Sequence, residues 1–254
     1  MKISAVQFQS VTGDITSNLA KHLEFIKVAV AQGADLVFFP ELSLIGYEPK
    51  LAQSLATETT DSRLDVFQQY SDILNIIIGV GLPISVKSKV QIGMVWFTPE
   101  MPRCSYAKQQ LHVDELPFFV AGDVQLILET STHKLAPAIC YESLQLNHAD
   151  NAANLGANIY LASVAKPIGG MTKAQLHYPV IARKHNMYAI VSNSVGPCDN
   201  FISVGQSAAW NNRGELIMKM DSESEGLLIV DTISEKASIH KYRLTDVDYT
   251  LNLT

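Results

Sequence analysis

The 254-residue sequence predicts an α/β fold, because apolar runs with strand character alternate with segments of helical periodicity. Four of these runs are apolar almost throughout, at residues 35–40, 76–80, 158–164 and 188–195. Strands without polar alternation need cover on both faces, so we expect two sheets backed by helices. No linker, low-complexity tract or internal repeat interrupts the alternation, and we therefore expect residues 1–254 to form a single domain.

The first half of the chain is expected to begin with a strand, since residues 1–8 alternate in the manner of one. Asp14 or Thr16 can cap the helix that follows, and Gly33 can end it. The remaining elements of this half are, in order, a strand at 35–40, a helix at 62–75, a strand at 76–80, and short strands joined by turns at 90–130.

The second half repeats the helix-and-strand unit and ends in several strands. We expect, in order, a helix at 144–155, a strand at 158–164, a helix at 172–187, a strand at 188–195, and strands near 204–210, 215–220 and 226–231. Asn211-Asn212-Arg213-Gly214 is typical of a hairpin turn. The segment after the last strand, residues 232–254, is expected to be a C-terminal tail that packs on a partner subunit or on its own chain. Its apolar residues are Tyr242, Leu244, Tyr249, Leu251 and Leu253.

Composition and charge exclude several classes of function. The net charge of −6 provides no basic surface, so we expect no nucleic-acid partner. The longest apolar stretch, residues 76–84, contains two glycines and a proline and is too short to cross a bilayer. The first residues lack the apolar segment of a signal peptide, and three cysteines without a pairing pattern suit a reducing compartment. The sequence therefore predicts a cytoplasmic protein.

Three residues with chemical potential, Glu41, Lys108 and Cys140, each follow a strand-forming run. An acid, an amine and a thiol at such positions could supply a base, an oxyanion donor and a nucleophile. Each also has an ordinary alternative, as a solvated acid, a surface lysine and a small buried side chain. In the catalytic interpretation, burial makes Glu41 a better proton acceptor near neutral pH, and Lys108 lowers the pKa of the thiol.

The sequence around Cys140 favours the catalytic interpretation. Ile139-Cys140-Tyr141-Glu142 ends a strand and precedes a predicted helix. A thiol on such a sharp turn is exposed, and the backbone N–H groups that follow it point at the group it attacks. Cys104 and Cys198 have no such context and are expected to be structural.

The ordered motifs around Glu41, Lys108 and Cys140 resemble the nitrilase superfamily of carbon–nitrogen hydrolases, and the resemblance covers nearly the whole chain. It implies a four-layer α–β–β–α sandwich and a homodimer or higher homo-oligomer. It also implies a second catalytic glutamate, at Glu115, which orients Lys108 and the substrate. Asp114, one residue away, is the competing choice.

The substrate pocket is expected to be small and to involve Tyr47, Tyr141, Glu142 and Ser163. Tyr47 resembles a pocket-wall tyrosine of the superfamily, with packing as the alternative, and the backbone N–H of Tyr141 is expected to bind the oxyanion. For Glu142, structural hydrogen bonding at the helix start is favoured over contact with a cationic substrate group. Lys166 is interpreted either as a carboxylate anchor or as a solvated lysine.

Other site types lack support in the sequence. His112, Asp114 and Glu115 form one acidic cluster without a second group at ligand spacing, so no metal is expected. No glycine-rich nucleotide motif is present, and no cofactor is expected. No histidine is placed to act as the base of a papain-like enzyme.

The sequence also departs from the superfamily pattern. Ser143 and the residues after it replace the usual Pro-Glu and arginine, and His185 stands where an acid is usual. Cys-Tyr-Glu also occurs in a membrane-bound acyltransferase branch, against which the lack of a spanning run argues. We therefore expect a cofactor-free hydrolase of small amides that works through a cysteine thioester. Nitrile hydrolysis at the same site and a non-catalytic binding protein are the alternatives.

Overall fold

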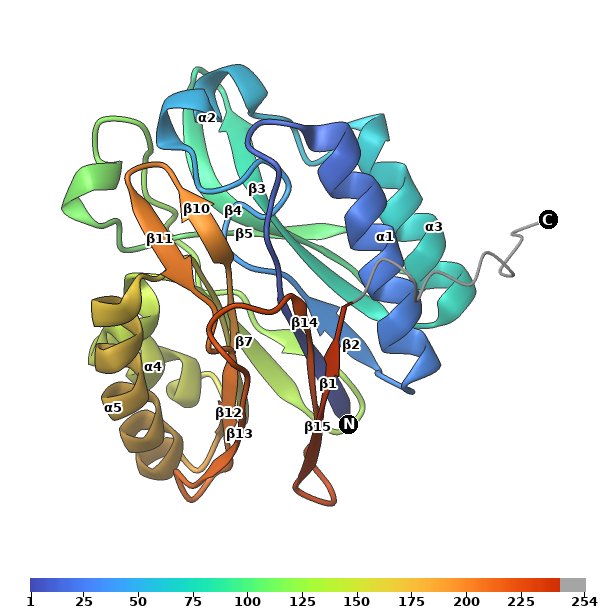
Figure 1. The fold of residues 1–254 in the computed structure, drawn as a ribbon, viewed down its shortest axis with the longest axis vertical. Helices are drawn as coiled ribbons and strands as arrows, with labels where there is room; N and C mark the ends of the chain where they lie inside the picture. The colour runs from blue at the N-terminus through green and yellow to red at the C-terminus, as the bar shows by residue number, and fades with distance from the viewer. Residues whose placement is uncertain (243–254) are drawn as a thin grey trace.

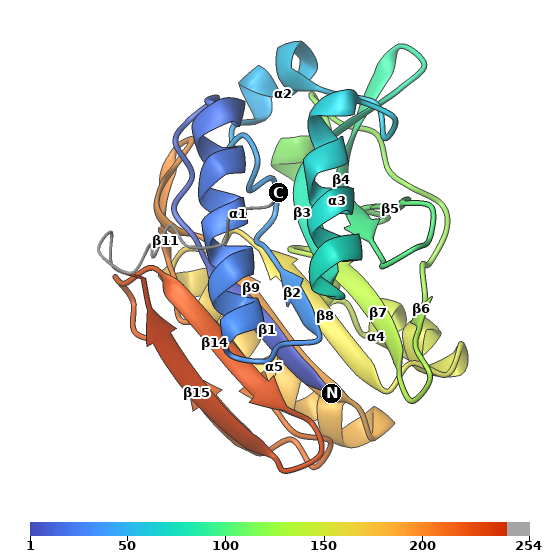
Figure 2. The same cartoon turned by 90° about the vertical axis from the view of Figure 1, so that its right-hand side faces the viewer.

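The computed structural model describes residues 1–242, which form two stacked β-sheets between two layers of helices (Figures 1 and 2). The first sheet contains, from edge to edge, β15 (Lys236–Lys241), β14 (Gly226–Asp231), β1 (Lys2–Gln7), β2 (Leu36–Phe38), β3 (Ile77–Val86), β4 (Lys89–Phe97) and β5 (Cys104–Ala107). The second contains β13 (Leu216–Lys219), β12 (Ala208–Trp210), β9 (Tyr188–Asn193), β8 (Ile159–Val164), β7 (Lys134–Ile139) and β6 (Leu128–Glu129). A separate ribbon pairs β10 (Val195–Cys198) with β11 (Phe201–Val204).

Helices cover the outer face of each sheet. The helices are α1 (Ile15–Ala31), α2 (Pro49–Leu55), α3 (Asp65–Leu74), α4 (Leu146–Asn154) and α5 (Ile168–His185). Helices α1 and α3 lie on the first sheet, and α4 and α5 lie on the second (Figures 1 and 2). Three apolar clusters fill the spaces between these layers: one joins the two sheets, one joins the first sheet to α1 and α3, and one joins the second sheet to α4 and α5. The predicted four-layer α–β–β–α sandwich is therefore confirmed.

Parallel strands place the ends of several chain segments at one edge of the sandwich. Strand β2 runs parallel to both β1 and β3, and β7, β8 and β9 are mutually parallel. The residues that follow β2 and β7 emerge from the carboxyl ends of these strands, where the connecting loops of α/β proteins carry functional groups. The two sheets thus supply different parts of one site.

Hydrogen bonds across the sandwich hold the two sheets in fixed alignment at this edge. The Ser163 hydroxyl on β8 donates to the carbonyl of Phe39, which follows β2, at 2.8 Å. The Ser192 hydroxyl on β9 donates to the carbonyl of Val6 on β1 at 2.6 Å. All four residues are buried, so these bonds satisfy polar groups that water cannot reach.

Several elements differ from the sequence-based expectation. The segment at 76–97 is one long hairpin of β3 and β4, rather than a short strand followed by further short strands. Helix α2 was not predicted, and the strand expected at 204–210 is interrupted between β11 and β12. The Asp14 side chain accepts a hydrogen bond from the Ser17 N–H, which identifies Asp14, rather than Thr16, as the cap of α1.

Residues 236–241 of the expected tail form a strand and pack on their own chain, which is the second of the two expected alternatives. Strand β15 pairs antiparallel with β14 along its whole length. Its alternation turns Ala237 and Ile239 toward the apolar core, which explains why this polar-looking segment forms a strand. The Tyr242 ring stacks on Phe25 of α1, with ring centroids 4.6 Å apart. Leu244, Tyr249, Leu251 and Leu253 lie outside the described residues.

Candidate active site

Glu41 lies in the turn that follows β2, and β3 approaches this turn closely. A side-chain Cβ at Gly81 would lie 2.4 Å from the Pro40 carbonyl oxygen and 2.7 Å from the Leu42 nitrogen, so only glycine fits there. The Glu41 side chain is almost fully buried. Its Oε1 accepts a hydrogen bond from Lys108, and hydrogen bonding with the Cys140 thiol also lowers the pKa of the carboxyl. The carboxyl thus interacts with both the ammonium and the thiol whose proton it can receive.

Lys108 follows β5 and is fully buried between two carboxylates. Its Nζ donates to Glu41 Oε1 at 2.8 Å and to Glu115 Oε1 at 2.6 Å. Burial alone would lower the pKa of Lys108, but the charges of Glu41, Cys140 and Glu115 raise it above the ordinary value. These charges therefore favour the ammonium form of the lysine in this site.

Glu115 ends a 3₁₀ turn, Val113–Glu115, and is 1% exposed. Besides the ammonium, it accepts hydrogen bonds from the Tyr47 hydroxyl at 3.0 Å and from the His112 backbone N–H at 2.7 Å. The competing residue Asp114 points elsewhere: its side chain is 76% exposed and pairs with His112. The structure thus places Glu115, and not Asp114, beside Lys108.

Cys140 lies on a sharp turn between β7 and the 3₁₀ turn Glu142–Leu144, which precedes α4. Its φ of 45° is in the left-handed region, which costs a non-glycine residue about 1–3 kcal/mol. The turn is held by hydrogen bonds from the Cys140 N–H to the Ser163 carbonyl and from the Ser143 hydroxyl to the Cys140 carbonyl. This is the strained strand-to-helix turn that the sequence predicts, and it leaves the sulfur at the wall of a cavity.

The pKa of the Cys140 thiol lies above its ordinary value. Burial and the negative charge of Glu41 raise it to about 11, although Lys166 and Lys108 oppose this rise. Lys108 does lower the thiol pKa, as the sequence predicts, but burial and the charge of Glu41 outweigh this effect. Burial also raises the pKa of Glu41, while Lys108 lowers it. A buried carboxyl of raised pKa is a suitable acceptor for the thiol proton.

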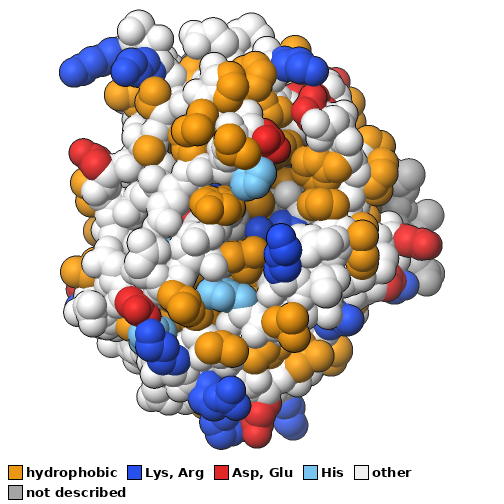
Figure 3. Space-filling model, turned by 90° about the vertical axis from the view of Figure 1, so that its left-hand side faces the viewer, with side chains coloured by type: hydrophobic (Ala, Val, Ile, Leu, Met, Phe, Trp, Pro, Cys, Tyr) orange, Lys and Arg blue, Asp and Glu red, His pale blue; other side chains and the backbone are white. Residues whose placement is uncertain are grey.

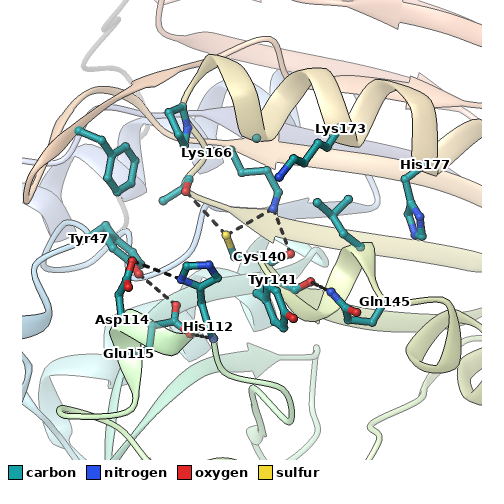
Figure 4. A pocket seen from close by; sticks show the side chains of 15 residues that line it. Tyr47, His112, Asp114, Glu115, Cys140, Tyr141, Gln145, Lys166, Lys173 and His177 are labelled. Carbon is teal, nitrogen blue, oxygen red and sulfur yellow. Dashed lines mark hydrogen bonds and ion pairs between the residues drawn. The ribbon is translucent and has the colours of Figure 1, made fainter.

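The cavity beside Cys140 has a volume of about 570 Å³. Basic and histidine side chains gather around the hollow on this face (Figure 3). Figure 4 shows Cys140 at the centre, with Tyr47 and Glu115 on one side and Lys173 and His177 projecting from α5 on the other. The lining residues are Tyr47, His112, Asp114, Glu115, Cys140, Tyr141, Leu144, Gln145, Ala165, Lys166, Pro167, Gly170, Lys173, His177 and Phe201.

Of the four residues predicted to bind substrate, the structure places Tyr47 and Tyr141 in the cavity wall and Glu142 and Ser163 outside it. Ser163 is fully buried and is used in the bond between the sheets. The missed wall residues His112, Lys173, His177 and Phe201 come from a loop, a helix and a hairpin, and no sequence motif joins them.

Glu142 connects the segment that carries Lys108 to the segment that carries Cys140. It is fully buried, and its Oε1 accepts hydrogen bonds from the Tyr106 hydroxyl and the Ile139 N–H, each at 2.7 Å. Its Oε2 accepts from the backbone N–H groups of Gln109 and Gln110, at 2.6 and 3.2 Å. Burial raises its pKa to about 7, against the effect of these bonds. Gln109 follows Lys108, and Ile139 precedes Cys140. Glu142 therefore fixes the position of Lys108 relative to Cys140, which fits its expected role in structural hydrogen bonding rather than contact with the substrate.

Lys166 lies closer to the nucleophile than the sequence suggests. It is 4% exposed, so the solvated alternative is wrong. Its Nζ lies 3.5 Å from the Cys140 sulfur and 3.2 Å from the Cys140 carbonyl oxygen. Lys166 follows a strand, β8, as Glu41, Lys108 and Cys140 follow theirs. This shared position at a strand end is the sequence signal that could have identified Lys166.

Two other features are absent from residues 1–242. No group of three or more His, Cys, Asp or Glu residues in that part of the chain is arranged to hold a metal ion. No helix there is long and apolar enough to span a membrane.

Comparison with protein families and curated proteins gives several similarities. The profile of the family "Carbon-nitrogen hydrolase" matches residues 2–238. The glutamine-dependent NAD(+) synthetase of Acinetobacter baylyi is 27% identical over 241 residues, which are 89% of this chain and 43% of that protein. The chain thus spans less than half the length of this relative. The nitrilase of Pyrococcus abyssi is 26% identical over 237 residues, with 89% of this chain and 86% of that protein covered.

Solved structures of the same architecture include an amidase from Nesterenkonia sp. AN1, at 23% identity, with a TM-score of 0.83. The alignment covers 91% of this chain and 90% of that one, and the amidase carries an acetamide moiety on its active-site cysteine. A variant of the same amidase in complex with butyramide has a TM-score of 0.84, 22% identity and 92% coverage of both chains.

Proposed function

Because this chain belongs to the carbon–nitrogen hydrolase family, whose members cleave C–N bonds, we propose that it hydrolyses a small amide through a thioester at Cys140. The observation that carries the proposal is the arrangement of Cys140 at an open cavity beside the buried set Glu41, Lys108 and Glu115. These groups supply a nucleophile, a proton acceptor and a fixed positive charge within one site.

In the first half of the reaction, the Cys140 sulfur attacks the amide carbonyl carbon, and its proton passes to Glu41. The raised pKa of the thiol favours proton transfer during the attack over a preformed thiolate. The negative charge that develops on the carbonyl oxygen is stabilised by Lys108 and by the backbone N–H of Tyr141. Glu41 then protonates the leaving nitrogen, and ammonia or an amine departs.

In the second half, water replaces the amine. Glu41, again a carboxylate, takes a proton from the water, which attacks the thioester carbon. The carbon–sulfur bond breaks, the electron pair returns to the sulfur, and the sulfur takes the proton from Glu41. The thiol and the carboxylate are thereby restored, and the acid product leaves. Glu115 holds the Lys108 ammonium in place throughout, while its own position is fixed by Tyr47 and the His112 N–H.

The proposal is tested with a panel of short primary amides, with glutamine included because several relatives are glutamine-dependent NAD(+) synthetases. We expect ammonia release from the amides, diversion of product to a hydroxamate when hydroxylamine is added, and much slower turnover of the matching nitriles. Nitriles that react faster than amides would support the alternative that the Pyrococcus nitrilase suggests. No ammonia from either class would favour a binding protein.

We further propose that the protein acts in the cytoplasm and as a homodimer. Helix α5 supports the second part, because Leu176 and Val180 lie one turn apart on it and are 73% and 46% exposed. Exposed apolar side chains on one helix face are typical of a contact between subunits.

The dimer is tested by light scattering at micromolar concentration. We expect twice the mass of one chain for the native protein and a monomer for Leu176→Glu, since a buried charge would oppose the contact. Ile73→Glu is the matched control, because Ile73 on α3 is also 61% exposed. A native monomer, or equal effects of both substitutions, would contradict a dimer through α5.

A further inference from the structure

The backbone of Lys166 is fixed on both sides of the residue. Its N–H donates to Asn193 Oδ1 at 2.9 Å, and its carbonyl accepts from Ser203 Oγ at 3.1 Å and from Asn193 Nδ2 at 3.3 Å. Asn193 and Ser203 are themselves buried, on β9 and β11. The side chain is thereby directed at Cys140 (Figure 4). The fold therefore fixes the position of Lys166, unlike that of a mobile surface lysine.

The charge of Lys166 is not neutralised by the protein. Within residues 1–242 it forms no ion pair with a carboxylate, whereas Lys108 is paired with both Glu41 and Glu115. The Glu41, Lys108 and Glu115 set carries one net negative charge when both acids are ionised. A thiolate beside that set would face net repulsion, and the Lys166 ammonium, 3.5 Å from the sulfur, opposes this repulsion more strongly than Lys108 does.

We propose that Lys166 is a further catalytic residue, which stabilises negative charge on the Cys140 sulfur when the thiol proton leaves and again when the thioester breaks. In the first event the proton moves from sulfur to Glu41, while the electron pair on sulfur forms the bond to carbon. In the second the carbon–sulfur bond breaks and the pair returns to sulfur. Lys166 itself gains and loses no proton. This role rests on the proposed function of Cys140.

The proposal distinguishes Lys166 from the other charged and titratable groups around the sulfur. Glu41 and Glu115 oppose a thiolate, and Lys108 favours it less than Lys166 does. Tyr178 is buried and Tyr47 is half-buried, and burial raises the pKa of each, so both hydroxyls are neutral. The remaining groups of this kind in the cavity wall are His112, Asp114, Tyr141, Lys173 and His177.

The test measures the rate at which iodoacetamide alkylates Cys140, read by peptide mass so that Cys104 and Cys198 are counted separately. Lys166→Met keeps most of the length of the side chain and removes its charge. Loss of an ammonium at this distance raises a thiol pKa by about 1–3 units. The higher pKa reduces the fraction of thiolate and so slows alkylation. A more basic thiolate is also more nucleophilic, which offsets about half of this slowing on a logarithmic scale. We therefore expect alkylation at a fixed pH near 8 to slow by roughly 4-fold to 40-fold.

Two further variants separate charge from shape. Lys166→Arg restores a positive charge and is expected to recover most of the rate. Lys173→Gln removes a second lysine from the same cavity, one that makes no contact with the sulfur, and is expected to change the rate less than about 2-fold. The proposal is overturned if Lys166→Met alkylates at the native rate, if Lys166→Arg is as slow as Lys166→Met, or if Lys173→Gln slows alkylation as much.

The alkylation result is independent of the substrate. If the amide panel releases no ammonia while Lys166→Met still slows alkylation, the proposed function fails and the role of Lys166 at the sulfur stands. If amides turn over normally in Lys166→Met and alkylation is unchanged, the proposed function stands and the role of Lys166 at the sulfur fails. Thermal unfolding of each folded variant shows whether loss of rate follows loss of structure.

Discussion

Replacing Cys140 with alanine is expected to lower amide turnover by at least about 10⁴-fold, because no other group can form the thioester. The fold should persist, since Cys140 is small and partly exposed and alanine bears the same strain at a φ of 45°. The measurements are kcat/KM on the best amide of the panel and thermal unfolding by circular dichroism. Cys140→Ser should also be nearly inactive, because a carboxylate base generates an alkoxide far less readily than a thiolate.

The other two cysteines provide matched controls for this prediction. Cys198 is 4% exposed, and burial and nearby acids raise its pKa to about 12. Burial also raises the pKa of Cys104. Neither lines the cavity, so Cys104→Ala and Cys198→Ala should keep activity. Full activity in Cys140→Ala would rule out the thioester.

Replacing Glu41 with glutamine is expected to lower kcat by about 10²-fold to 10⁴-fold, which is the usual contribution of a positioned general base. Glutamine keeps the size of the side chain and can accept the bond from Lys108, but it cannot take the thiol proton. Asp114→Asn is the matched control, because it neutralises a carboxylate in the same cavity wall that lies away from Lys108. Equal losses in the two variants would show that the electrostatic potential of the cavity, and not a base, is responsible.

The same pair of variants tests how activity depends on pH. Glu41 must be ionised to accept a proton, and burial raises its pKa above the ordinary 4.5. Activity is therefore expected to be lost as the pH falls through that raised pKa, so the acidic limb of the kcat/KM profile should lie above 4.5. This limb should persist in Asp114→Asn and disappear in the residual activity of Glu41→Gln. A native limb at or below the ordinary carboxyl pKa would contradict the role of Glu41.

The sequence was most informative where function depends on local chain geometry. Glu41, Lys108 and Cys140 could be proposed because each follows a strand, and strand ends are recognisable from apolar runs and the turns after them. The strained turn at Cys140 was predictable for the same reason, since a strand and a helix meet within a few residues. The family resemblance supplied Glu115, and the structure distinguishes it from Asp114 by burial.

What the sequence did not reveal depends on contacts between distant segments. The direction of the thiol pKa is a sum of burial and four neighbouring charges from separate loops, and no single motif carries that sum. The role of Lys166 was ambiguous because it depends on the position of Cys140 in the folded chain. Strand β15 was missed because its polar positions face outward and only its pairing with β14 makes it a strand.

The hydrogen bond from Ser163 to the Phe39 carbonyl has a consequence for how this site can diversify. The base emerges from one sheet and the nucleophile from the other, so the distance between them is set by the alignment of two layers. Buried residues that never meet the substrate, such as Ser163, therefore constrain the chemistry. The cavity wall is built instead from loops, a hairpin and α5, with side chains such as Lys173 and Phe201. Substitutions there can therefore alter substrate choice without changing the distance between base and nucleophile.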